Sequence, residues 1–153
     1  LPNSVSWYRP RLERSLTWIE RCAPDREAPI LDVGGGASTL VDALLELGYS
    51  NIAVADLSSH ALTHARERLG EGSGRVRWIV GDVTTPLVDA QSCEIWHDRA
   101  VFHFLTHPQA VASYVEQLKR ALRPGGHAIV ATFAPDGPER CSGLPIQRCS
   151  AEE

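Results

Sequence analysis

The sequence contains no methionine among its 153 residues, and it begins with Leu1. We therefore expect that residues before Leu1 were removed or are not represented. No two of its four cysteines, Cys22, Cys93, Cys141 and Cys149, form a C-x-x-C pair. Without such a pair a zinc site is not expected, and we predict no metal site. Reduced thiols fit best, which favours a cytoplasmic location.

Long apolar runs and an excess of basic residues are also missing. No run approaches the roughly 20 apolar residues that span a bilayer, and no signal-peptide pattern is present, so no membrane association is expected. Lysine and arginine total 15 against 19 aspartate and glutamate residues, and the net charge is -4. A protein that binds nucleic acid by neutralising phosphates usually has a basic face. We therefore expect no nucleic-acid partner.

Short apolar runs alternate along the chain with amphipathic segments, which is typical of an α/β fold with a doubly wound, mostly parallel sheet. We expect one domain over residues 1–153, with an N-terminal helical segment (1–28), a core (29–133) and a loop-like tail (134–153). The predicted helices cover residues 11–22, 40–47 (capped by Ser38 or Thr39), 59–69 (capped by Ser58) and 108–122. The predicted strands cover residues 30–33, 52–55, 76–80, 94–96 and 128–133.

Carboxylates lie at the ends of four predicted strands: Asp32, Asp56, Asp82 and Asp98. Ligands of open parallel sheets bind beyond the carboxyl ends of the strands. Glycines at 34–36 permit a sharp turn into a helix and a close approach of the backbone to a ligand. Asp56, about 20 residues further on, is placed to accept hydrogen bonds from ribose hydroxyls. The pattern predicts a site for an adenosine-containing ligand.

The glycine turn distinguishes between two such ligands. A dinucleotide usually needs a third glycine, as in G-x-G-x-x-G, and residues 37–40 supply none. Asp32 precedes the turn, where a carboxylate suits an ammonium group and would repel a pyrophosphate. S-adenosyl-L-methionine has an ammonium, a sulfonium, a ribose and an adenine but no phosphate, and it fits this acidic frame.

Together the segments ILDVGGGAS, AVADLS, VGDV, WHDRAVFHFL and LRPGGHAIVATF resemble class I S-adenosylmethionine-dependent methyltransferases, which have a Rossmann-like fold. The resemblance covers residues 30–133. It implies that Asp32, Gly34 and Gly36 hold the methionine end and that Asp56 binds the ribose. It further implies that Leu57 packs on the adenine, that Asp82 accepts from its amino group and that Val83 donates a backbone N–H to its ring.

Two further segments resemble narrower groups. The sequence DRA at 98–100 is similar to the thiopurine and tellurite-resistance methyltransferase branch, where this loop borders both methyl donor and acceptor. The sequence CSGL at 141–144 is similar to small bacterial methyltransferases. The resemblance implies methyl transfer to a small-molecule acceptor by in-line displacement.

Three residues are candidates for a catalytic role. We expect Asp98 to contact the site, and it either takes part in catalysis or only borders the cofactor. His103 is either a general base or a core residue of the aromatic stretch 102–104. Arg99 either orients an anionic acceptor or pairs with a nearby carboxylate.

The roles of the terminal aromatics and cysteines also stay open. In this family the N-terminal segment often covers the cofactor as a lid, so Trp7 and Tyr8 either cover the methyl group or pack against the sheet. Cys141 and Cys149 either bind a soft acceptor or are loop thiols.

The family fold usually adds a C-terminal antiparallel hairpin after strand five, and the tail predicts none. Strand five would then be an exposed edge, which predicts either a homodimer through that edge or a shortened chain. Two other functions remain as alternatives. One is a cofactor-binding module that is inactive or depends on a partner, and the other is an NAD(P)-dependent oxidoreductase.

Overall fold

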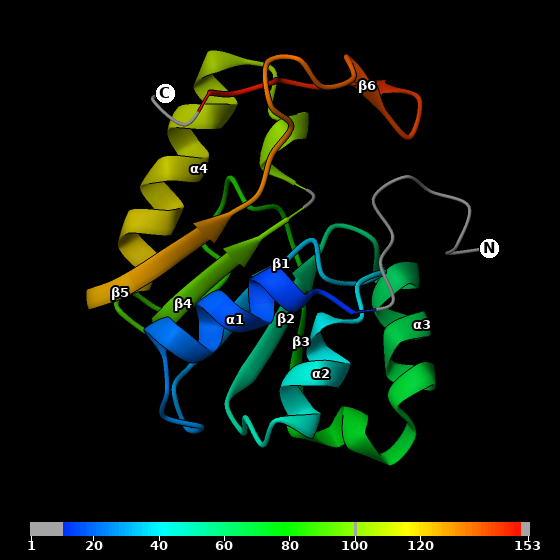
Figure 1. Ribbon diagram of the computed structural model, residues 1–153, viewed down its shortest axis with the longest axis vertical. Helices are drawn as coiled ribbons and strands as arrows, with labels where there is room; N and C mark the ends of the chain where they lie inside the picture. The colour runs from blue at the N-terminus through cyan, green and yellow to red at the C-terminus, as the bar shows by residue number, and fades with distance from the viewer. Residues whose placement is uncertain (1–10, 100, 151–153) are drawn as a thin grey trace.

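The computed structural model describes residues 11–99 and 101–150, and a five-stranded sheet forms the centre of this region. Its strands are β1 (Ile30–Val33), β2 (Ile52–Asp56), β3 (Val76–Val80), β4 (Cys93–Asp98) and β5 (Leu122–Val130). They lie in the order β3-β2-β1-β4-β5, and every neighbouring pair is parallel (Figure 1). The predicted doubly wound parallel sheet is confirmed, and the strand order reverses between β1 and β4.

Helices cover both faces of this sheet. The described helices are α1 (Glu13–Cys22), α2 (Leu40–Glu46), α3 (Ser59–Leu69) and α4 (Pro108–Ala121), with 3-10 turns η2 (Gly70–Arg75) and η3 (Phe102–Phe104). In Figure 1, α1, α2 and α3 lie in front of the sheet and α4 lies on the other side. Ser58 caps α3 as predicted, because its hydroxyl accepts from the N–H of Ala61 at 3.1 Å.

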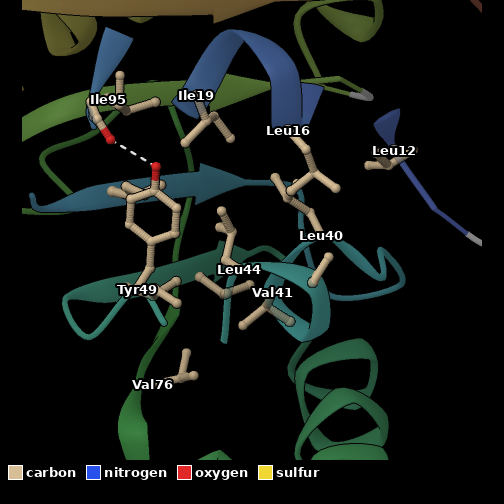
Figure 2. Packing of buried hydrophobic residues seen from close by; sticks show 14 of the residues in the cluster. Leu12, Leu16, Ile19, Leu40, Val41, Leu44, Tyr49, Val76 and Ile95 are labelled. Atoms are coloured by element: carbon tan, nitrogen blue, oxygen red, sulfur yellow. Dashed lines mark hydrogen bonds between the residues drawn. The ribbon is translucent and has the colours of Figure 1, made fainter. Parts of the chain in front are cut away.

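The core on the α1 and α2 face comes from the predicted apolar spacing. Leu16 and Ile19 of α1 and Leu44 of α2 are at most 3% exposed and pack with strand residues of the same cluster (Figure 2). Each fully buried aliphatic side chain contributes about 1.5–3 kcal/mol by leaving water. The hydroxyl of Tyr49 donates to the carbonyl of Ala23 at 2.7 Å, so this buried phenol is satisfied (Figure 2).

On the opposite face, α4 packs against β4 through one aromatic pair. The Trp96 indole N–H donates to the Tyr114 hydroxyl at 3.0 Å, and their rings meet edge to face. The Tyr114 hydroxyl donates in turn to Oδ2 of Asp98 at 2.8 Å. This chain of bonds fixes the carboxyl end of β4 against α4.

Several predicted boundaries were wrong. Helix α1 begins at Glu13 rather than at residue 11. Strand β5 covers Leu122–Val130 rather than 128–133, so the predicted last helical residue, Leu122, is already in the strand. The Pro-Gly-Gly segment at 124–126 lies inside β5, and the pairing of β5 with β4 is irregular there, with a register shift between Cys93 and Ile95.

The tail was predicted to contain no strand, and this was also wrong. Strands β6 (Arg140–Cys141) and β7 (Leu144–Pro145) form a short antiparallel hairpin. Its turn residues Ser142 and Gly143 have φ of 50° and 79°, the left-handed values of a tight hairpin turn. The hairpin does not join the main sheet, and within the described residues β5 remains an edge strand.

Within residues 11–99 and 101–150, no helix combines the length and the apolar character needed to cross a membrane.

Candidate functional site

A cavity of about 680 Å³ opens at the carboxyl ends of β1, β2 and β3, beside the point where the strand order reverses. This is the expected ligand position in an open parallel sheet, and the volume is in the range of small-molecule sites. The predicted site residues that line it are Gly34, Asp56, Leu57, Asp82, Val83 and His103. The sequence therefore placed six candidates from four separate segments around one cavity.

The glycine turn after β1 is held tightly under this cavity. Gly34 has φ of +69°, and its N–H bonds to the carbonyl of Ala55 at 2.7 Å. A Cβ at Gly36 would lie 2.8 Å from Cβ of Ala61 and 2.9 Å from Oδ2 of Asp56. The turn therefore brings β1, β2 and α3 together at a separation that leaves no space for a side chain at Gly36.

Asp56 is fixed by its neighbours and still has acceptor capacity. Its Oδ2 accepts from the N–H of Gly36 at 3.1 Å, and its Oδ1 accepts from the N–H of Ser58 at 2.8 Å. Each carboxylate oxygen has a second lone pair. The side chain is thus pre-positioned to accept from a pair of ligand hydroxyls.

Asp82, Val83 and Leu57 form the next segment of the wall. Oδ1 of Asp82 accepts from both the N–H and the hydroxyl of Thr84, at 2.8 and 2.7 Å. Its Oδ2 accepts no bond from a described residue. Leu57 is 71% exposed although it lines the cavity, which is unusual for a large apolar side chain. The exposed side chain of Leu57 can pack on a flat aromatic ring, and Oδ2 of Asp82 can accept a hydrogen bond from an amino group on that ring.

Asp32 does not line the cavity but lies beneath the glycine turn. Its Oδ1 is 2.7 Å from Nδ1 of His97, and Nε2 of His97 is 2.9 Å from the hydroxyl of Ser15. Its Oδ2 is very close to the position that a Cβ at Gly35 would take. Asp32 therefore supports the turn from below. No sequence signal pointed to His97 or Ser15 as its partners.

Asp98 and Arg99 also lie outside the residues that line the cavity. The Asp98 carboxylate is fully buried and accepts from the N–H groups of Val101 and Phe102, at 2.9 and 3.0 Å, and from the hydroxyl of Tyr114. Burial raises the pKa of Asp98, and these donors act in the opposite direction. Asp98 thus holds the η3 turn that carries His103.

His103 lines the cavity and is 1% exposed. Burial lowers its pKa, which favours the neutral imidazole. Sequence reasoning missed the neighbours of His103 in the wall, since nothing distinguished them from core residues: Val101, Phe104, Leu105 and Ala110. Of the tail, Cys141, Ser142 and Leu144 also line the cavity and Cys149 does not, whereas Trp7 and Tyr8 lie outside the described residues.

Comparison with known proteins agrees with this geometry. A model of the methyltransferase domain family matches residues 30–126. A malonyl-[acyl-carrier protein] O-methyltransferase of Paenibacillus sp. (strain JDR-2) is 31% identical over 114 residues, which cover 72% of this chain and 40% of that protein. The EEF1A lysine methyltransferase 2 of Danio rerio is 26% identical over 127 residues, with 79% and 54% covered.

Solved structures show the same fold. The 1,6-didemethyltoxoflavin-N1-methyltransferase of Burkholderia thailandensis, solved with 1,6-didemethyltoxoflavin and S-adenosylhomocysteine, has a TM-score of 0.68 at 24% identity and covers 94% of this chain and 61% of its own. The PH0226 protein of Pyrococcus horikoshii OT3 has a TM-score of 0.69 at 18% identity, with 85% and 62% covered.

The chain spans about half the length of the curated relatives it matches. The family model nevertheless covers the glycine turn, all the strand-end carboxylates and the first half of β5. The chain therefore belongs to the methyltransferase domain family, in its class I, Rossmann-like form.

Proposed function

We propose that this chain binds S-adenosyl-L-methionine in the cavity and transfers the methyl group to a small molecule. The observation that carries the proposal is the convergence of Asp56, Asp82 and the glycine turn on one cavity at the switch point of the sheet. The names of the curated relatives, which are methyltransferases, support the same chemistry.

Each portion of the donor has a matching portion of the wall. Asp56 would accept from the ribose hydroxyls, Leu57 would pack on the adenine, and Asp82 with Val83 would bind the adenine edge. Gly34 would contact the methionine end, with Gly36 and Asp32, which do not line the cavity, supporting the turn. The net charge of -4 and the two rim carboxylates also suit a cationic ligand better than a pyrophosphate.

When bound, the donor supplies a methyl group already activated by a positive sulfonium. The chain has to orient the acceptor in line with that group and exclude water. Asp98 would act through position, because it accepts from the N–H groups of Val101 and Phe102 at the start of the η3 turn that brings His103 to the cavity. Arg99 does not line the cavity, so we propose that it orients the loop rather than the acceptor.

Calorimetric titration tests the donor site directly. We expect S-adenosylmethionine and S-adenosylhomocysteine to bind with one site per chain, and NAD⁺ and NADP⁺ not to bind. Binding of a dinucleotide in place of both sulfur ligands would instead support the oxidoreductase alternative.

An alternative function is that of a module that binds the methyl donor but transfers the methyl group only together with a partner. The small size of the β6–β7 hairpin favours it, because among the described residues the tail contributes only Cys141, Ser142 and Leu144 to the cavity wall. Donor binding with no transfer to any member of a panel of thiols, amines and phenols would support this reading over an independent enzyme.

A further inference from the structure

The cavity extends beyond the proposed donor site into a region formed by the η3 turn and the C-terminal tail. A main-chain bond joins these two segments, because the N–H of Gln147 donates to the carbonyl of His103 at 2.7 Å. A second bond, from the N–H of Cys149 to the carbonyl of Phe133 at 2.9 Å, holds the tail against the residues that follow β5. We call this region the tail subsite, and its lining residues are Val101, His103, Phe104, Cys141, Ser142 and Leu144.

His103 is the unusual member of the tail subsite. Its ring packs at centroid distances of 4.2 Å from Phe104 and 5.2 Å from Phe133. Both ring nitrogens are buried, and neither has a hydrogen-bond partner among the described residues. A buried polar group without a hydrogen-bond partner destabilises the folded chain. In the wall of a cavity, a ligand is the partner that could recover this cost.

The surroundings of His103 disfavour charge. Burial lowers the pKa of the imidazole, which disfavours a positive charge on the His103 side chain. Phe104 and Leu144 add apolar surface, and Cys141 is 3% exposed. A charged ligand group would lose its hydration here, whereas an apolar ring would gain contact area.

We propose, on the basis of the function proposed above, that the tail subsite binds the methyl acceptor and selects an uncharged heteroaromatic molecule whose attacking ring nitrogen carries a hydrogen. That hydrogen is donated to a ring nitrogen of His103. Cys141 and Leu144 of the β6–β7 hairpin form the apolar wall against the ring. The β6–β7 hairpin thus helps to determine which acceptors bind.

The charges balance in such a transfer. The proton leaves the ring nitrogen of the acceptor for His103, and the freed electron pair forms the bond to the methyl carbon. The carbon–sulfur electron pair stays on sulfur, which becomes a neutral thioether. The positive charge lost from sulfur passes to the imidazole, so the net charge of the cavity is unchanged. Because burial lowers the pKa of His103, the imidazole readily gives the proton up again. His103 returns the proton to water when the product leaves.

Because both ring nitrogens of His103 are buried, an acceptor reaches them only if part of the cavity wall moves. The His103 ring rotates, or the hairpin shifts slightly, when the acceptor enters; side-chain changes of this size are common on binding.

Ligand binding to the chain saturated with S-adenosylhomocysteine tests the inference without relying on turnover. The probes are small heteroaromatics with a ring N–H, each with its N-methyl, carboxylate and aminomethyl derivatives; indole, 1-methylindole, indole-3-carboxylate and 3-aminomethylindole form one such group. We expect neutral N–H members to bind about tenfold or more tightly than their charged derivatives.

Substitution of His103 with Phe keeps the shape of the ring and removes its nitrogens. We expect H103F to weaken the N–H member by about three- to tenfold and to leave the N-methyl member unchanged. A merely structural role for His103 would weaken both members equally. His127→Gln is the matched control, because His127 lies on β5 and outside the cavity.

Cys141 and Cys149, the two cysteines of the tail, provide a second variant with a matched control. Cys141→Leu is expected to reduce binding of every ring in the library, whereas Cys149→Leu, outside the cavity, is expected to leave it unchanged. Unfolding midpoints of all four variants show whether each one folds, and H103F carries the test if C141L does not.

Failure of the inference is distinguishable from failure of the proposed function. If S-adenosylhomocysteine does not bind, the proposed function fails. If it binds but charged members bind as well as neutral ones, or no neutral member binds, only the inference is overturned. Equal effects of H103F on the N–H and N-methyl members would overturn the role of His103.

Discussion

Nδ1 of His97 lies 2.7 Å from Oδ1 of Asp32, and both side chains are buried. The two residues are register partners on the neighbouring strands β1 and β4. The hydroxyl of Ser15 is 2.9 Å from the other ring nitrogen of His97, so α1 takes part in the same hydrogen-bond network. One imidazole thus links three elements directly below the glycine turn, and the shape of the proposed donor site depends on a residue that does not line the cavity.

Replacing His97 with Phe is expected to lower the free energy of unfolding by about 3–5 kcal/mol, because Asp32 would keep a buried carboxylate without its partner. Urea denaturation measures the change. In a chain that already carries Asp32→Asn, the same substitution should cost clearly less, since no charge is left unpaired. A loss below about 1 kcal/mol in the parent chain would contradict this role.

Asp56→Asn is expected to weaken S-adenosylmethionine binding by about 10- to 100-fold, since one hydrogen bond to a charged group contributes about 1.5–3 kcal/mol. Calorimetric titration gives the affinity. Asp89→Ala serves as the control, because Asp89 is exposed and does not line the cavity. Unchanged affinity in D56N would remove Asp56 from the donor site.

Gly36→Ala is expected to reduce stability by about 1–3 kcal/mol and to abolish tight donor binding, because the added methyl would be 2.8 Å from Cβ of Ala61. Gly74→Ala is the comparison, since a Cβ there meets nothing within 4 Å. That change should alter the free energy of unfolding by less than about 1 kcal/mol. Similar effects of the two substitutions would mean that the turn tolerates a side chain.

His103 is expected to make stability fall at low pH. Its pKa is lower in the folded protein than the ordinary value of 6.5, because burial disfavours the imidazolium. Below about pH 6.5 the unfolded chain therefore binds a proton that the folded chain does not, and unfolding becomes easier as the pH falls, by at most about 1.4 kcal/mol per pH unit. Unfolding free energies measured between about pH 7 and pH 5 should depend less on pH in H103F than in the parent chain, with H127Q following the parent. The same pH dependence in H103F and the parent would show that His103 does not cause the slope.

Strand β5 is expected to pair with β5 of a second copy, since it is an edge of the sheet and Val130 is 39% exposed. Sedimentation analysis should show a dimer at high concentration. Val130→Lys should shift the population toward monomer, because a charge at an edge strand opposes pairing. A clean monomer at the highest concentration would count against the dimer.

The sequence by itself determined the frame of the site. The carboxylates of Asp56 and Asp82 and the glycine turn lie where their own strands end, and strand ends are set by local signals that a single chain segment carries. Because parallel strands place all these ends on one edge, the cavity could be predicted before any contact was known.

Only the tertiary structure decided how the site is supported and closed. The bond between His97 and Asp32 joins residues 65 positions apart, and it exists because β1 and β4 are neighbours in the sheet. The tail likewise reaches the η3 turn through its bond to the carbonyl of His103. Such contacts depend on strand order and on the path of the chain in space. Local secondary-structure preferences do not encode these long-range contacts, because the sequence around each residue is the same whether or not its contact partner lies nearby in the fold.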